Sequence, residues 1–199
     1  MKFISKRNSV TLRDGLVHKQ VKDPRAAALE ASVLRDLRGR GVAVPEVLGC
    51  KDGLLELEYL PGEPLPDVME RGGYDPDALA GALCEWFAAF YAAVPPGESR
   101  GDVNGRNFLY DGAKIYGVDF EARAFGPPAR DAGRLAAFIG TYEACDKAKQ
   151  LALAQAFIQK FAGRFGCSLE DITAERETEF AAMRQRRQSL RAIFSAWGF

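Results

Sequence analysis

Short apolar runs separated by polar turns dominate the first part of the chain and predict β-structure there. The runs cover residues 2–4, 10–12 and 16–21, and Asp14-Gly15 separates the second from the third. An Asp-Gly pair between two such runs is a strong hairpin signal, because a type I′ turn needs positive φ at both central positions. We therefore expect the chain to begin with strands, two of which form a tight hairpin.

Two charged residues interrupt this apolar pattern. Lys19 shares one face of its predicted strand with Val17 and Val21, because side chains alternate with a period of two. Snorkelling of the lysine at a surface is the simplest explanation. A helix is predicted over residues 26–38, and Glu30 flanks or joins its apolar stripe. That carboxylate lies either at the edge of the stripe in water or against a cation inside, because a buried charge must be paired. The stripe itself consists of Ala26, Leu29, Val33, Leu34 and Leu37.

The next part of the chain predicts extended structure and then a joint. Residues 42–48 and 54–60 are expected to be extended around a turn at Asp52-Gly53. Pro61-Gly62 then breaks the chain, with two more prolines close behind, which is typical of a hinge between lobes. We predict a β-rich N-terminal lobe at residues 1–60 and a mostly helical C-terminal lobe at 61–199. Together they give a two-lobed α+β fold.

Helices are predicted for most of the second lobe. Asp75 is expected to cap a helix that has Pro76 at its first position. Asp131 is expected to precede another helix, and two long amphipathic helices are expected to finish the chain.

A second hairpin is predicted inside the helical lobe. Two short apolar runs, at residues 107–110 and 113–118, flank Asp111-Gly112, which again favours a two-residue turn. The expected pairs are Tyr110 with Ala113 and Asn107 with Tyr116. The open end of this hairpin carries Asp102, Asn107 and Asp119. Three oxygen-bearing side chains in one place suit a hard cation such as Mg²⁺.

The amino-acid composition argues against several classes of protein. The 199 residues carry equal numbers of acidic and basic side chains, so the net charge is zero. That balance argues against a dedicated nucleic-acid binder. The four cysteines form no CxxC pair and there is one histidine, so a structural zinc site is not expected. With no apolar leader and no run of membrane-spanning length, we expect a cytoplasmic protein without membrane contact. The oligomeric state does not follow from the sequence.

The central hairpin carries a resemblance to a known superfamily. Asp102-x4-Asn107 is followed, twelve residues after the asparagine, by Asp119 within the run Val118-Asp119-Phe120-Glu121. This pattern resembles the catalytic core of the protein-kinase-like superfamily. Its closest match is the aminoglycoside phosphotransferase and choline kinase branch. Those enzymes carry a Gly-Asp loop that ends in Asn, and then a hydrophobic strand that ends in Asp-Phe or Asp-Trp with an acidic residue.

The resemblance extends upstream and accounts for both unusual charges. The strand around Lys19 looks like the one that bears the ATP-positioning lysine, and Glu30 looks like its ion-pair partner. Residues 58–62 look like the run into the segment that contacts adenine. The resemblance implies that backbone groups near Glu58 and Leu60 meet the adenine edge.

It also implies an activity and roles for the remaining residues. The implied activity is ATP- and Mg²⁺-dependent transfer of the γ-phosphate to a hydroxyl of a small molecule. Asn107 and Asp119 would hold Mg²⁺, and Asp102 would accept or orient the proton of the attacking hydroxyl. Lys19, held by Glu30, would contact the α- and β-phosphates. By the same resemblance a further aspartate, Asp131, would order the catalytic loop by hydrogen bonds.

Several departures from the family pattern leave alternatives open. The glycine-rich phosphate loop is absent, and Ser5–Ser9 stands where it would lie. Arg100 replaces the usual histidine before Gly-Asp, and Asn104 stands where small-molecule kinases often have histidine. Taken singly, the acidic residues could also be ordinary turn or strand-end residues. A compact atypical Ser/Thr protein kinase and a nucleotide-binding pseudokinase or scaffold are the alternative functions.

Overall fold

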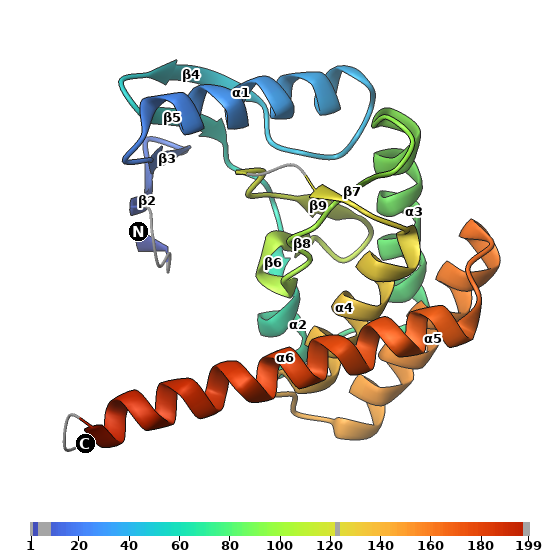
Figure 1. Cartoon of the computed structure of the whole chain (residues 1–199). Helices are drawn as coiled ribbons and strands as arrows, with labels where there is room; N and C mark the ends of the chain where they lie inside the picture. Colours follow the sequence, from blue (N-terminus) through green and yellow to red (C-terminus); the bar gives the residue numbers. More distant parts are fainter. Residues whose placement is uncertain (1, 4–8, 122–123, 197–199) are drawn as a thin grey trace.

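The computed structural model describes residues 2–3, 9–121 and 124–196, and it is an α+β structure with a sheet-rich N-terminal part and a helical C-terminal part (Figure 1). Among the described residues, an antiparallel sheet of order β1-β2-β3-β5-β4 forms the first part. Its strands are β1 (Lys2–Phe3), β2 (Ser9–Arg13), β3 (Leu16–Gln20), β4 (Val47–Lys51) and β5 (Leu54–Glu58). The predicted boundary between lobes at residues 60 and 61 stays a prediction.

The first hairpin forms as the sequence predicts. Asp14 and Gly15 have φ values of 51° and 78°, and Arg13 pairs with Leu16 across them. Asp52-Gly53 makes the same kind of turn between β4 and β5, with φ values of 50° and 81°. Only parts of the two segments expected to be extended form strands, because β4 begins at Val47 and β5 ends at Glu58.

Helix α1 (Pro24–Gly39) follows the hairpin and packs beside the sheet (Figure 1). Asp23 caps it by accepting a hydrogen bond from the Arg25 amide. The predicted apolar stripe is wrong at Leu29, whose side chain is 49% exposed. The face that is buried has helical spacing and consists of Ala27, Glu30, Ala31, Leu34 and Leu37. Glu30 therefore lies in the middle of the buried face. The sequence pattern alone did not decide between this position and one at the edge of the face.

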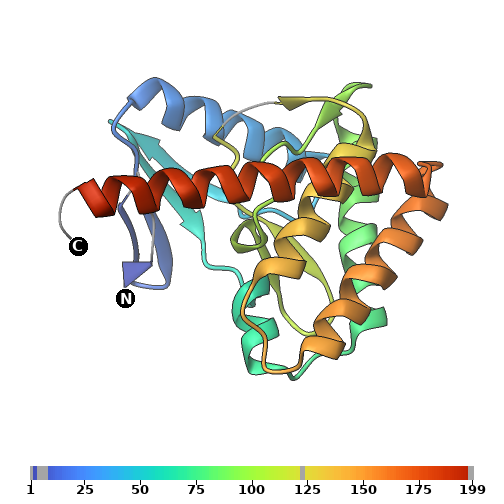
Figure 2. The same cartoon turned by 60° about the horizontal axis from the view of Figure 1, so that its bottom comes forward.

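The helical part consists of α2 (Leu65–Arg71), α3 (Pro76–Ala93), α4 (Pro128–Thr141), α5 (Lys147–Phe165) and α6 (Leu169–Ala196). Helix α3 packs on α5, and α4 packs on α6, which is a long rod that passes the other helices in both views (Figures 1 and 2). Asp75 caps α3 by accepting from the Ala78 amide at 2.7 Å, as predicted. The expectation that Asp131 precedes a helix is wrong, because α4 already begins at Pro128. No helix within the described ranges is long and apolar enough to cross a membrane.

A hairpin of β8 (Phe108–Tyr110) and β9 (Ile115–Gly117) lies between the sheet and the helices. The predicted register is wrong, because Tyr110 pairs with Ile115 and Leu109 pairs with Tyr116. The cause is the Asp111 carboxylate, which accepts hydrogen bonds from the amides of Ala113 and Lys114 at 2.9 and 2.8 Å. The turn is thereby centred one residue later than expected, with positive φ at Gly112.

Short elements complete this region. Strand β6 (Glu63–Pro64) pairs with β8, and β7 (Glu98–Ser99) pairs with β10 (Ala124–Phe125). A 3-10 turn, η1 (Gly105–Asn107), leads directly into β8.

Trp86 ties the sheet-rich part to the helices. Its indole Nε1 donates to the Ala43 carbonyl at 3.0 Å, and the Gly117 amide donates to the same carbonyl at 2.9 Å. The indole ring occupies the space where a Cβ of Gly117 would lie, so this position requires glycine. The segment after α1 is therefore fixed to both α3 and β9.

Candidate functional site

Lys19 lies at the centre of a charged cluster. It comes from β3, and its side chain is 7% exposed. Its Nζ lies 2.9 and 2.8 Å from the two carboxylate oxygens of Glu30, on α1. It also lies 2.6 Å from Asp119 Oδ1 and 3.0 Å from Glu121 Oε1, both just beyond β9. One ammonium thus contacts three carboxylates that reach it from two distant segments of the chain.

The pKa values of this cluster follow from burial and charge. Burial by itself lowers the pKa of Lys19, but Glu30 and Asp119 outweigh it and raise the pKa above its ordinary value. Lys19 is therefore a cation at neutral pH. Burial raises the pKa of Glu30, and the charge of Lys19 opposes that effect. Glu30 also accepts a hydrogen bond from the Phe120 amide at 3.2 Å, so one carboxylate joins the lysine to the segment that carries Asp119.

The carboxylates of this cluster also fit a divalent cation. One oxygen each from Glu30, Asp119 and Glu121 lies within 4.8 Å of the others. Oxygen ligands of this kind are those that Mg²⁺ and Ca²⁺ prefer. Three carboxylates against one ammonium leave an excess of negative charge that a cation would compensate.

Asn107 links the loop that carries Asp102 to the end of β9. Its side-chain Nδ2 donates to the Asp102 carbonyl at 3.3 Å, and its own carbonyl accepts from the Val118 amide at 2.9 Å. Its side chain and backbone thus keep this end of the loop beside the end of β9. Ligation of Mg²⁺ by Asn107 together with Asp119 stays a prediction, and the carboxylates that gather with Asp119 are Glu30 and Glu121.

Asp102 is exposed, and it lies on a loop whose backbone is hydrogen-bonded to a buried side chain. Its Oδ1 accepts from the Asn104 amide at 3.2 Å. The buried carboxylate of Asp131 accepts from the amides of Arg100 and Gly101 at 2.6 and 3.1 Å. The hydrogen-bonding role predicted for Asp131 is thus confirmed. Burial raises the pKa of Asp131, and the amide of Arg100 opposes that effect.

Tyr142 supports the other end of the same loop. Its hydroxyl donates to Asn104 Oδ1 at 2.9 Å and accepts from the Gly105 amide at 2.8 Å. Burial raises the pKa of Tyr142 to about 12, so the phenol is neutral at physiological pH. A Cβ at Gly105 would lie 2.8 Å from the tyrosine ring, and glycine is therefore required for this contact.

The two residues predicted near adenine have structural partners of their own. The Glu58 amide donates to the Glu46 carbonyl at 2.9 Å, and the Glu58 carboxylate pairs with Arg38 at 2.7 Å. Leu60 is buried just after β5. Their contact with adenine stays a prediction. Of the segment at the phosphate-loop position, Ser5–Asn8 lies outside the described residues.

The sequence did not assign three residues that shape this region. Glu121 contacts Lys19, and its acidic character two positions after Asp119 was the available signal. Tyr91 donates to Asp131 at 2.8 Å, but in the sequence it looked like an ordinary core residue of α3. Arg100 was visible as a departure from the family pattern, with no role attached.

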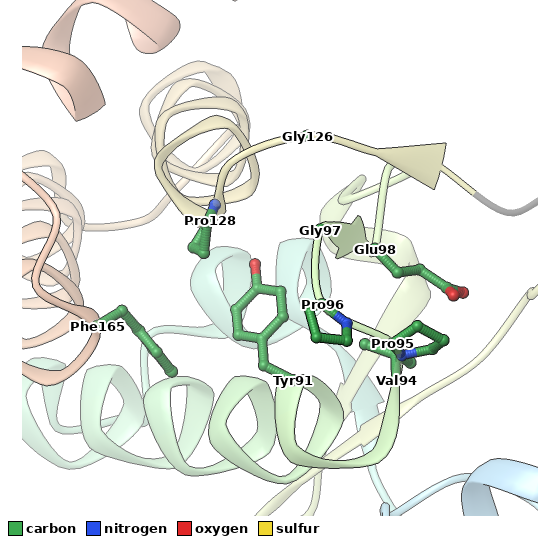
Figure 3. A pocket seen from close by; sticks show the side chains of 9 residues that line it. All are labelled: Tyr91, Val94, Pro95, Pro96, Gly97, Glu98, Gly126, Pro128 and Phe165. Carbon is green, nitrogen blue, oxygen red and sulfur yellow. The ribbon is translucent and has the colours of Figure 1, made fainter.

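A cavity of about 170 Å³ lies beside Tyr91, on the side of the helical part where α3 ends (Figure 3). Its lining is largely apolar, and Figure 3 shows Tyr91 and Phe165 facing it along with the proline-rich segment after α3. None of the predicted site residues lines this cavity.

Comparisons with known proteins identify the fold. No family model matches the sequence. No curated protein matches it either. Among solved structures, the complex of APH(2'')-IIa with streptomycin and ATP matches with a TM-score of 0.64 and 12% identity, over 90% of this chain and 80% of that one. ADP-bound aminoglycoside phosphotransferase APH(2'')-Ib matches with a TM-score of 0.59 and 13% identity, over 83% of this chain and 79% of that one. A choline/ethanolamine kinase family protein from Mesorhizobium loti matches with a TM-score of 0.54 and 16% identity, over 94% and 80%.

The chain therefore has the protein-kinase-like fold, in the form found in aminoglycoside phosphotransferases and choline/ethanolamine kinases. Both the predicted fold class and the predicted structural resemblance are confirmed. At these identities the likeness establishes the fold and leaves the activity to be argued from the residues.

Proposed function

We propose that this protein is an ATP- and Mg²⁺-dependent phosphotransferase that moves the γ-phosphate to a hydroxyl of a small-molecule acceptor. The observation that carries the proposal is the contact of Lys19 with Glu30 and Asp119, within a protein-kinase-like fold. The three residues come from β3, from α1 and from the segment after β9. An exposed aspartate, Asp102, lies on the loop that Asn107 joins to that segment.

The charged cluster suits the handling of phosphates. Lys19 keeps its charge because Glu30 pairs with it in a buried position, so the ammonium is available to phosphate oxygens. Asp119, with Asn107 and Glu121, would hold a divalent cation, which supplies charge neutralisation to the phosphates when it is bound. Lys19 and Glu30 meanwhile hold this part of the site together.

Asp102 suits the role of the residue that receives the hydroxyl proton. In the proposed step, the acceptor oxygen forms a bond to the γ-phosphorus while the bond to the β,γ-bridging oxygen breaks and ADP leaves. The hydroxyl proton passes to the Asp102 carboxylate. Asn107 binds the Asp102 carbonyl and Asp131 binds the amide of the preceding Gly101, so the Asp102 carboxylate is presented in a defined place.

The structural neighbours favour a small-molecule acceptor over a protein. Two of the matching structures contain streptomycin or gentamicin bound to APH(2'')-IIa. The neighbour with streptomycin also contains ATP, and APH(2'')-Ib contains ADP. A compact protein kinase and a pseudokinase are the alternatives that the experiment must separate.

The test is a Mg²⁺-ATP turnover screen against hydroxylated metabolites, aminoglycosides and choline-like amines, with Asp102→Asn run beside the wild type. We expect Asp102→Asn to lower turnover by about 100-fold or more. Its affinity for ATP should change by less than about threefold. Asp77→Asn is the matched control, because Asp77 is an exposed aspartate of α3 that pairs with Lys160 away from the loop.

Three results would redirect the proposal. Undiminished turnover in Asp102→Asn would remove the assigned proton acceptor. Phosphorylation of proteins without any small-molecule acceptor would favour the protein kinase. Stabilisation by ATP that is independent of Mg²⁺, with no turnover on any acceptor, would favour the pseudokinase.

A further inference from the structure

Arg100 is a buried cation whose partners are unusual for an arginine. Its side chain lies in the interior, with the residue 3% exposed. Its Nη2 donates to the carbonyls of Val118 and Asp119 at 2.6 and 2.9 Å. Its guanidinium carbon lies 4.1 Å from the centre of the Phe120 ring. Within the described part of the chain, no carboxylate makes an ion pair with it, and its Nε has no hydrogen-bond partner.

The backbone that Arg100 contacts is in a conformation that needs support. Asp119 has a φ of 66°, in the left-handed region. For a residue with a Cβ this conformation is less favourable than the right-handed one, because the Cβ comes too close to the following carbonyl oxygen. The flanking groups are tied on both sides, because Arg100 holds the Asp119 carbonyl and Glu30 accepts from the Phe120 amide. From this turn the Asp119 carboxylate reaches Lys19.

We propose that Arg100 is a positioning residue, which holds the left-handed turn at Asp119 through two carbonyls and the Phe120 ring and so aims the Asp119 carboxylate at Lys19. The backbone of Arg100 is itself fixed by Asp131, which also holds Gly101 beside Asp102. One residue therefore connects the loop of Asp102 to the segment of Asp119.

Packing alone does not account for an arginine at this place. An apolar side chain of similar length would fill the same space without the desolvation of a charge. The burial of Arg100 lowers its pKa, while Asp102 and Asp119 are among the carboxylates that oppose the effect. The guanidinium instead contributes donors aimed at two successive carbonyls and a flat surface that stacks on an aromatic ring.

The first experiment measures the turn directly and needs no ligand. Hydrogen exchange is followed at the Phe120 amide, which donates to Glu30, in the wild type and in Arg100→Met. We expect the protection of this amide to fall about tenfold in the variant, because two hydrogen bonds to the turn are lost. Amides in the middle of α3 and α5 should keep their protection. Arg40→Met is the matched control, because Arg40 also donates to a backbone carbonyl, that of Ala93, outside the site.

The second experiment rests on the proposed function and measures ATP affinity with and without Mg²⁺. In Arg100→Met we expect the gain in affinity that Mg²⁺ provides to fall about tenfold, since the Asp119 carboxylate is no longer aimed. The affinity for ATP without metal should change by less than about threefold. A residue that only stabilised the fold would lower the melting temperature and leave this ratio unchanged.

The outcomes separate the two proposals. Absence of ATP binding in the wild type would overturn the proposed function, and the exchange experiment would still decide the role of Arg100. Unchanged protection at Phe120, or an equal loss at Phe120 and throughout α3 and α5, would overturn the positioning role. If Arg100→Met does not fold, Arg100→Lys takes its place. That variant keeps the charge and a donor but loses the planar stacking, and it should retain part of the protection.

Discussion

Two buried cations, Lys19 and Arg100, approach Asp119 in different ways. Lys19 contacts the Asp119 side chain and two further carboxylates, Glu30 and Glu121. Arg100 contacts the Asp119 main chain, a second carbonyl and an aromatic ring. A phosphate could replace carboxylates as a partner of Lys19, and a metal ion could replace Lys19 as a partner of the carboxylates. The second has partners that no small ligand can exchange.

The difference suggests a division of labour around one residue. Carboxylates can take new partners when ligands bind, because an ion pair has little geometric constraint on which cation it uses. Carbonyls and a ring fix a guanidinium in one orientation. Lys19 is thus suited to handle ligands, and Arg100 is suited to keep the backbone in place while the ligands change.

The largest effect is expected when the ion pairs of Lys19 are removed. Lys19→Met leaves the buried carboxylate of Glu30 without its cation, and we expect the free energy of unfolding to fall by about 3–5 kcal/mol. Adding Glu30→Gln should restore a large part of the stability but no affinity for ATP. Urea denaturation and calorimetric titration measure the two quantities. A loss of stability that Glu30→Gln leaves unchanged would show that charge burial is not the cause.

The second largest effect is expected at the uncharged partners of Arg100, of which the Phe120 ring is one. We expect Phe120→Leu to cost up to about 2 kcal/mol for its contact with the Arg100 guanidinium, apart from the cost of lost packing. Phe90→Leu is the matched control, because the rings of Phe90 and Phe120 both contact the Trp86 ring, with centroid distances of 5.4 and 6.4 Å. A double-mutant cycle with Arg100→Met isolates the contact. Equal losses in the two phenylalanine variants, with no coupling to Arg100, would contradict the stacking.

A smaller effect separates the turn from the carboxylate that it carries. Asp119→Gly and Asp119→Ala both remove the partner of Lys19, but only glycine takes a φ of 66° without strain. The glycine variant should therefore be more stable than the alanine variant by about 1 kcal/mol. Thermal unfolding of the pair measures the difference. If alanine proved equal or better, the turn would need no support from Arg100.

The smallest effect tests a part of the loop that is held without charge. Between pH 10 and 12 the unfolded chain loses the Tyr142 proton while the folded protein retains it, because the folded pKa is raised to about 12. This contribution to stability is fully present below pH 10 and is lost as the pH rises towards 12. The stability advantage of the wild type over Tyr142→Phe should therefore shrink across this range in chemical denaturation. An advantage that stayed constant would mean that the phenol ionises normally in the folded protein.

The sequence predicted local structure well where one interaction decided it. Asp14-Gly15 forms the expected two-residue turn, with positive φ at both positions and with Arg13 paired to Leu16 across it. At Asp111-Gly112 the same dipeptide failed to predict the register, because the Asp111 carboxylate caps two nearby amides and moves the turn. Turn propensities do not include hydrogen bonds of this kind between a side chain and nearby amides.

The site was predictable where a residue broke the pattern of its own element. Lys19 among valines and Glu30 at an apolar stripe were visible in this way, and they do form an ion pair. Arg100 gave no such signal, because its partners are backbone carbonyls from a segment 18 and 19 residues away. Contacts of that kind depend on the tertiary fold and leave no trace in the side-chain pattern.

The contacts of Lys19 also have a consequence for the order in which the protein folds. Lys19 and Glu30 are 11 residues apart, but Lys19 and Asp119 are 100 residues apart. Closing the longer loop costs more chain entropy, and contacts of such separation make folding slow. The ion pair with Asp119 should consequently be among the last native contacts to form. Competence to bind a ligand at this site would then report that the whole chain, from the first sheet to the central hairpin, has reached its native arrangement.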